Sequence, residues 1–331
     1  MLISILLPVY NVAPYLTECL NSIQTQSEIN WELLAVNDFS TDESWQILQE
    51  YAAKDKRIKT FQNNKKGIIP ALRLAFEKSK SELITRMDAD DRMAVDKLKY
   101  LKAALLEKGK GHLATNLVEY FAEQALGEGY RKYATWLNEL TLAERNFEEI
   151  YKECVIPSPS WMMYRTDLQA CGAFESNQYP EDYDLCFRWY AQKLKVVGVP
   201  KILHHWRDHS TRTSRNDPTY ADNRFLDLKV DYFLGLDQQK DKTLVLWGAG
   251  KKGKAIAKLL AKQTIPFRWM CNRKSKWGHL IHGIELENVQ KLTSIKNPQV
   301  IVAVANSEAQ QEIRKFFQEN RILEQNFFFF C

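Results

Sequence analysis

The chain has 331 residues, of which 45% are hydrophobic and 12% aromatic, a composition that supports packed cores and excludes a disordered protein. Its 46 basic and 41 acidic residues leave a net charge of +5, too small to predict nucleic acid as the main partner; an anionic nucleotide and an anionic membrane surface suit it equally. The six cysteines form no C-x-x-C pair and no metal-like spacing with histidine, which indicates neither a zinc site nor a disulfide framework and favours the reducing cytoplasm.

The first part of the chain alternates strand-like and helix-like segments. The apolar run Ile3 to Val9 lacks the basic start and cleavage site of a signal peptide and is too short to span a bilayer, so we interpret it as a buried strand. The pattern continues with strands predicted at 31–36, 58–61 and 82–85, and with helices at 14–23, 43–53, 69–80 and 95–107. Such alternation predicts an α/β fold with a mostly parallel sheet covered on both faces.

The pattern is less regular in the second part. Strands are predicted at 112–118, 161–164 and 195–199 and a helix at 181–191, whereas 119–160 shows no clean alternation and is expected to hold a substrate-specific part. The polar stretch Gln238 to Lys242 precedes a fresh strand and helix, so we place a domain boundary between 236 and 237. Residues 1–236 then form the main domain, and residues 237–331 form a small Rossmann-like α/β domain.

The acidic stretch from Thr85 to Arg92 lies between a predicted strand and a predicted helix. Asp88 and Asp90 are two apart on an extended segment, so their side chains point the same way, and their hard oxygen atoms suit Mg²⁺ or Mn²⁺. Asp in such a loop equally suits an Asx-turn or a helix cap. A functional role of this stretch is favoured because Pro8-Val9-Tyr10 and Asn37 to Asp42 also stand at the ends of predicted parallel strands. This arrangement brings all three segments to one edge of the sheet.

Two later motifs, Pro180 to Leu185 and Trp206 to His209, complete the set. Taken in order over residues 1 to 215, the motifs resemble the family 2 glycosyltransferases, inverting enzymes with the GT-A fold. The resemblance implies a nucleotide-diphospho-sugar donor, expected to be UDP-linked, and a divalent metal, Mn²⁺ or Mg²⁺. Its implied donor-binding residues are Pro8, Val9, Tyr10, Asp38, Arg86, Asp88, Ala89 and Arg207.

The resemblance also implies the remaining roles. Asp90 and His209 match the metal-binding positions, Asp182 matches the general base, and Glu181 stands beside it on the acceptor side. The implied acceptor is a saccharide or lipid-linked saccharide in cell-surface polysaccharide or glycan synthesis, in the cytoplasm or at the inner face of the cell membrane. Peripheral membrane association and homo-oligomer formation are left open.

Other interpretations compete with these roles. Asp38 is also suited to cap the following helix, Glu181 and Asp182 are acids that a helix N-terminus favours, and His204 and His205 are typical of packing or hydrogen bonding. The sequence departs from the family at Phe39, where a glycine is usual, and at Arg73, where an asparagine is usual.

The motif Gly248-x-Gly250-x-x-Gly253 follows an apolar strand and precedes a helix, as a dinucleotide fingerprint does. No carboxylate for a ribose follows the next strand, so close helix–strand packing is the favoured interpretation of these glycines. A nucleotide-binding oxidoreductase or sensor that uses this unit is the alternative function. A catalytically inactive binding module is a further alternative, which the retained Asp38, Asp90 and Asp182 argue against.

Overall fold

A computed structural model describes residues 1–122, 126–210, 212 and 225–331. The chain forms two compact units, Met1–Glu148 with Cys154–Arg212, and Glu149–Glu153 with Thr213–Cys331. This division differs from the predicted boundary at 236, because helix α9 (Leu226–Leu236) belongs to the C-terminal unit. There it packs on α10 (Lys251–Lys262), and Gln263 Nε2 donates a hydrogen bond to Asp231 Oδ1 at 2.7 Å.

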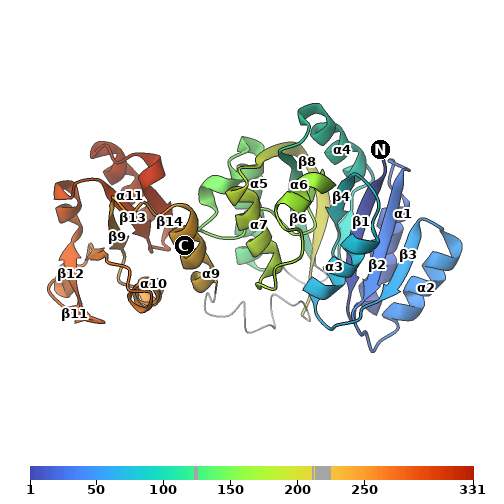
Figure 1. The fold of residues 1–331 in the computed structure, drawn as a ribbon, viewed down its shortest axis with the longest axis horizontal. Coiled ribbons are helices and arrows are strands. Elements are labelled where there is room, and N and C mark those ends of the chain that lie inside the picture. Colours follow the sequence, from blue (N-terminus) through green and yellow to red (C-terminus); the bar gives the residue numbers. More distant parts are fainter. Residues whose placement is uncertain (123–125, 211, 213–224) are drawn as a thin grey trace. The chain divides into compact units, whose positions relative to one another are not determined.

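The described part of the N-terminal unit contains a sheet of eight strands in the order β3-β2-β1-β4-β7-β6-β8-β5 (Figure 1). The pairs among β1 to β4 are parallel, as are β6 and β8, whereas β7 is antiparallel to both neighbours and β5 is antiparallel to β8. The predicted mostly parallel α/β fold is therefore confirmed. The strands are β1 Ile3–Val9, β2 Trp31–Asn37, β3 Ile58–Gln62, β4 Leu83–Arg86, β5 Arg92–Met93, β6 His112–Ala122, β7 Trp161–Tyr164 and β8 Lys195–Asp208.

Helices cover both faces of this sheet. Alternate residues of β1 share one core with the apolar faces of α1, α2 and α4, as the two-residue period of a strand requires. Helix α3 packs on β1 and β2 and adds none of its buried residues to that core, so it covers the other face. The helices are α1 Ala13–Gln24, α2 Ser44–Lys54, α3 Ile68–Lys78, α4 Lys97–Lys108, α5 Glu128–Ala143, α6 Arg165–Ala170, α7 Glu181–Ala191 and the 3₁₀ turn η1 Asn146–Glu149.

The parallel pairing brings the ends of β1, β2 and β4 to one edge. The Asp38 amide donates a hydrogen bond to the Val9 carbonyl at 2.7 Å, and the Met87 amide donates one to the Leu6 carbonyl at 3.0 Å. The three motifs that follow these strands therefore begin side by side, as the sequence predicts. Strand β8 is longer than predicted and ends at Asp208, so the polar run after Leu203 is part of the sheet.

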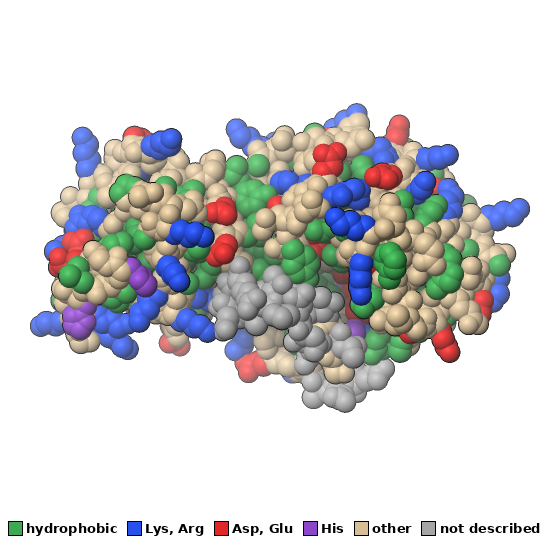
Figure 2. Space-filling view, turned by 60° about the horizontal axis from the view of Figure 1, so that its bottom comes forward, with side chains coloured by type: hydrophobic (Ala, Val, Ile, Leu, Met, Phe, Trp, Pro, Cys, Tyr) green, Lys and Arg blue, Asp and Glu red, His purple; other side chains and the backbone are tan. Residues whose placement is uncertain are grey.

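The C-terminal unit has its own sheet, in the order β11-β12-β10-β9-β13-β14. All its described pairs are parallel except β11 with β12, and the predicted final strand at Phe327 is confirmed by its pairing with β13. Lysine and arginine side chains are frequent on its surface (Figure 2). Its further elements are β9 Thr243–Trp247, β10 Arg268–Cys271, η3 Lys274–Lys276, β11 Leu280–Ile281, β12 Ile284–Asn288, η4 Val289–Ser294, β13 Pro298–Val302, α11 Ser307–Glu319, η5 Glu324–Asn326 and β14 Phe327–Phe329.

All six cysteines are free thiols, which agrees with the prediction of no disulfide framework. Within the described ranges, no helix combines the length and apolarity that a bilayer crossing requires.

Candidate active site

The loop after β4 presents the D-x-D segment. Asp88 Oδ1 accepts a hydrogen bond from Arg86 Nε at 3.0 Å, and its Oδ2 accepts one from Ser158 Oγ at 3.0 Å. The Asp91 amide closes a turn onto the Asp88 carbonyl at 3.2 Å. Both carboxylate oxygens of Asp88 are thus held by the protein, which fixes the loop that carries Asp90.

Asp90 lies against the end of β8. Its Oδ2 is 2.9 Å from His209 Nε2, so the two side chains expected to bind metal are neighbours. Arg207 Nε donates to the Asp90 carbonyl at 2.7 Å, and the same guanidinium group is paired with Glu18 and lies over the Tyr15 ring. Arg207 therefore supports the backbone of Asp90, whereas the resemblance implied a contact with the donor.

Arg86 joins the D-x-D loop to the start of α7. Its Nη1 lies 2.9 Å from Glu181 Oε1, while its Nε and Nη2 face Asp88, so one buried guanidinium group serves two carboxylates. Burial alone would lower the pKa of Arg86, but Asp88 and Glu181 raise it above its ordinary value. The arginine stays charged, and it brings together a residue predicted for the donor side, Asp88, and one predicted for the acceptor side, Glu181.

Asp182 follows Glu181 in the first turn of α7, where the helix dipole favours acids. Burial raises the pKa of Asp182, and the negative charge of the neighbouring Glu181 adds to the rise, to about 7. The positive charge of Arg86 opposes this rise. Asp182 Oδ1 accepts a hydrogen bond from the Tyr183 amide at 2.8 Å. A carboxylate with this pKa can accept a proton at neutral pH.

Asp38 ends β2 and is 6% exposed. Its carboxylate accepts hydrogen bonds from Asn63 Nδ2 at 2.7 Å and from the Gly67 amide at 2.9 Å, at the residue that precedes α3. The alternative that Asp38 caps the following helix does not hold, because Asp42 accepts the hydrogen bond from the Ser44 amide at the start of α2.

The two departures from the family pattern have structural accounts. Phe39 has a φ of 58°, the left-handed conformation that glycine adopts most easily, so the backbone path is kept although the residue differs. Arg73 of α3 donates to the carbonyl oxygens of Phe174 and Glu175 at 2.9 Å. Arg73 thus fixes the segment that leads to α7.

Tyr10 follows β1 and is 49% exposed at the same edge, with Lys66 Nζ 5.0 Å from its ring centre. Pro8 and Val9 end the strand itself. Ala89, between the two aspartates of the motif, is buried. The structure thus brings the residues that end β1, β2 and β4 to one edge.

A buried polar network, which no sequence motif predicts, lies behind the loop. Lys97 Nζ lies 3.0 Å from His204 Nδ1, and His204 Nε2 lies 2.9 Å from Asp91 Oδ2. Burial lowers the pKa of Lys97 to about 7 and lowers that of His204, and it raises that of Asp91. The sequence contains one signal for the burial of Lys97. This residue lies four positions before Leu101 and therefore on the apolar face of the predicted helix.

A family model described as "Glycosyl transferase family 2" matches residues 4–172, about half of the chain. The chain belongs to glycosyl transferase family 2. The glycosyltransferase GlyA of Streptococcus pneumoniae serotype 4 is 28% identical over 220 residues, which cover 64% of this chain and 31% of GlyA. The match therefore spans about a third of that relative.

Two solved structures share the GT-A fold of this member of glycosyl transferase family 2. S. aureus TarS 1–349 in complex with UDP-GlcNAc is 18% identical with a TM-score of 0.54, over 78% of this chain and 72% of the TarS 1–349 chain. The mannosyltransferase PcManGT of Pyrobaculum calidifontis, in complex with GDP-Man and Mn²⁺, is 15% identical with a TM-score of 0.52, over 70% of this chain and 63% of PcManGT.

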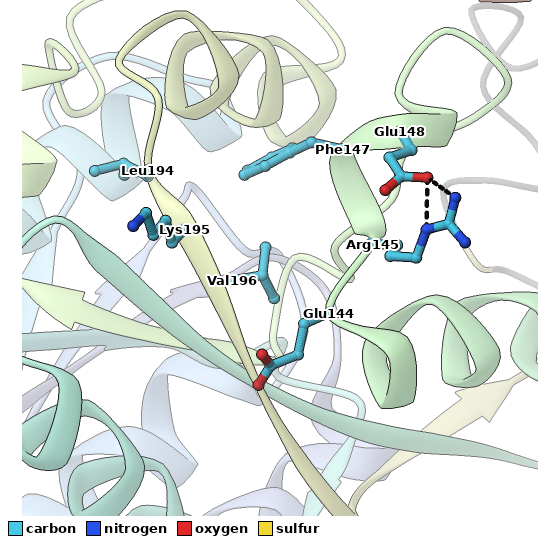
Figure 3. Close-up of a pocket in the computed structure, with 7 residues that line it drawn as sticks. All are labelled: Glu144, Arg145, Phe147, Glu148, Leu194, Lys195 and Val196. Atoms are coloured by element: carbon cyan, nitrogen blue, oxygen red, sulfur yellow. Dashed lines mark hydrogen bonds and ion pairs between the residues drawn. The ribbon is translucent and has the colours of Figure 1, made fainter. Parts of the chain in front are cut away.

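A surface cavity of about 330 Å³ lies elsewhere on the glycosyltransferase unit (Figure 3). Leu194, Lys195 and Val196 line it at the beginning of β8, opposite Glu144, Arg145, Phe147 and Glu148. His209 follows the other end of this strand. The cavity contains none of the predicted site residues, so we do not assign it to the transfer reaction.

The glycine motif of the C-terminal unit has a packing role at two positions. A Cβ at Gly253 would lie 2.1 Å from the Gly248 carbonyl oxygen, and one at Gly248 would lie 2.7 Å from the Ala303 carbonyl oxygen. Gly250 meets nothing within 4 Å, so packing does not explain it. Nucleotide binding by this loop stays a prediction.

Proposed function

We propose that the protein transfers a sugar from a nucleotide-diphospho-sugar to an acceptor hydroxyl, with inversion at the sugar carbon. The single observation that carries the proposal is the double contact of Arg86 with Asp88 and Glu181. It joins the loop suited to a diphosphate to the helix start that carries Asp182. A general base is useful only within reach of the reacting atoms.

The edge formed by Tyr10, Asp38 and Asp88 is the proposed donor site. A UDP-linked donor is supported by the UDP-GlcNAc complex of TarS, although PcManGT is in complex with GDP-Man. Binding experiments with UDP-linked and GDP-linked sugars will identify the nucleobase of the donor. Pro8, Val9, Arg86 and Ala89 are assigned to the same site through the family resemblance.

A divalent cation, Mn²⁺ or Mg²⁺, fits the pair Asp90 and His209. No cluster of three or more His, Cys, Asp or Glu side chains suited to a metal occurs in the described part of the chain. One carboxylate and one imidazole are nevertheless a sufficient protein share, since these cations take their other ligands from substrate phosphates and water. When bound, the cation stabilises negative charge on the leaving diphosphate.

Asp182 is the proposed general base. The acceptor oxygen bonds to the sugar carbon, its proton passes to Asp182, and the bond from that carbon to the diphosphate oxygen breaks. A positioned base typically contributes about 10²- to 10⁴-fold to the rate. Because one base acts in a single displacement, the sugar carbon inverts. Glu181 stays paired with Arg86 and orients this turn.

The acceptor is proposed to be a saccharide, free or lipid-linked, in cell-surface polysaccharide or glycan synthesis. The test is a screen of nucleotide sugars for Mn²⁺-dependent thermal stabilisation, because a ligand that binds the folded state raises the melting temperature. Each donor that stabilises the protein is then tested for nucleotide diphosphate release. The proposal would be overturned if no UDP-linked or GDP-linked sugar stabilised the protein and none released its nucleotide diphosphate.

A further inference from the structure

Charge is distributed unevenly along this chain. Residues 225–331 contain 17 lysines and arginines and 10 acidic residues, a net charge of +7, whereas the whole chain carries +5. Residues 1–224 are therefore slightly negative. The excess of positive charge belongs to the C-terminal unit, and net charge of one sign predicts an oppositely charged partner.

The outer face of α10 concentrates these charges. Lys251, Lys254, Lys258 and Lys262 are all exposed and recur every three or four residues, which places them on one side of the helix. The opposite side buries Ile256, Ala257 and Leu260, and the helix contains no acid. Within the described ranges, Lys254, Lys258 and Lys262 form no ion pair with any carboxylate, so their charges face solvent.

The turn after β10 extends this basic surface. Lys276 Nζ donates to the Ala249 carbonyl at 2.9 Å, which holds η3 against the beginning of α10, and the neighbouring Arg273 and Lys274 are exposed. Figure 1 shows α10 and β11 on the same side of this unit, the side on which basic and histidine side chains gather in Figure 2. Leu280 of β11 is 72% exposed and pairs with Glu285 of β12.

We propose that this surface, formed by the α10 lysines, Arg273, Lys274 and Leu280, binds an anionic lipid bilayer. Basic side chains are attracted to anionic headgroups, and an exposed leucine among them can enter the headgroup boundary. A soluble polyanion such as nucleic acid would use the charges but gain little from Leu280. The inference is independent of the proposed sugar transfer, since binding is measured without any donor.

The test uses the full chain and co-sedimentation with vesicles at physiological salt. Vesicles of equal parts phosphatidylcholine and phosphatidylglycerol should bind the protein, and phosphatidylcholine alone should not. The triple variant Lys254→Glu, Lys258→Glu, Lys262→Glu should bind at least on the order of a hundredfold more weakly, because each basic residue near such a surface contributes roughly a factor of five.

The matched control changes the same charge at other exposed sites of the same unit, Lys240→Glu, Lys296→Glu and Arg321→Glu, which precede β9, β13 and β14. It should keep most of the binding, and both variants should melt like the parent protein. Leu280→Gln should weaken vesicle binding by roughly tenfold and leave binding to heparin unchanged.

Three results would overturn the inference. They are equal binding to neutral vesicles, equal losses in the two triple variants, and binding to heparin or RNA without binding to anionic vesicles. The last result would identify a soluble polyanion as the partner of this surface.

Discussion

Arg86 Nη1 lies 2.9 Å from Oε1 of Glu181, a residue 95 positions further along the chain. The same guanidinium group contacts Asp88, so it connects the end of β4 to the first turn of α7. Residues that are proposed for the donor side and the acceptor side, and that are remote in sequence, thus share one buried charge. Buried pairs of this kind leave an uncompensated charge when one partner is removed.

Replacing Arg86 with lysine should impair transfer. Lysine keeps the positive charge but has no planar fork to reach Asp88 and Glu181 together. We expect kcat/KM to fall by roughly 10²-fold, the loss typical of a misplaced reacting group. Steady-state kinetics with the donor found in the screen would measure it. Arg57→Lys, whose ion pair with Asp55 is partly exposed, should leave kcat/KM within about twofold.

The pH dependence of transfer should report Asp182. Its pKa is raised to about 7, so the base form is present above that pH and is lost as pH falls below it. We therefore expect kcat/KM to decline about tenfold per pH unit on the acid side of 7. A kcat/KM that is constant between pH 5 and pH 8 would show that the rate does not depend on the protonation state of Asp182.

Lys97→Met should destabilise the glycosyltransferase unit. The change removes the donor to His204 Nδ1 and to the Pro159 carbonyl, which lies 2.6 Å from Lys97 Nζ. A buried acceptor left without a partner costs about 1–3 kcal/mol, so the free energy of unfolding should fall by at least that amount. Urea denaturation would measure it. Lys99→Met, on the exposed side of the same helix, should change it by less than about 0.5 kcal/mol.

Phe39→Gly should raise the free energy of unfolding slightly. Phe39 is held at a φ of 58° and is 48% exposed, so a phenylalanine bears left-handed strain with little burial to offset it. Glycine removes that strain, worth about 1 kcal/mol, although it also loosens the unfolded chain. Thermal melting compared with Phe39→Ala would separate the two effects, since alanine retains the strain. A glycine variant no more stable than the alanine variant would contradict the explanation.

Sequence patterns predicted the strands better than their mutual order. The bounds of β1 and β7 match the prediction because each is an apolar run that ends at polar residues. The antiparallel position of β7 depends on which neighbours it pairs with, and no local pattern contains that information. Strand β8 was predicted too short because histidines and charged residues in its second half mask the two-residue period.

For the site, the sequence predicted which loops meet but not which atoms pair. Parallel strands bring Tyr10, Asp38 and Asp88 to one edge by geometry alone. The pairing of Arg86 with Glu181 is tertiary and links segments from separate motifs. Lys97 was overlooked because a lysine in a helix is normally solvated, and only burial of its whole side chain makes it part of the site.

The most direct test is the turnover and donor affinity of Asp182→Asn. Asparagine keeps the shape of the side chain but cannot accept the proton, so turnover should fall by about 10²- to 10⁴-fold while calorimetry gives an unchanged donor Kd. The exposed Glu175→Gln, in the segment before α7, should behave like the parent protein. Full turnover in Asp182→Asn would contradict the central assignment of Asp182 as the general base.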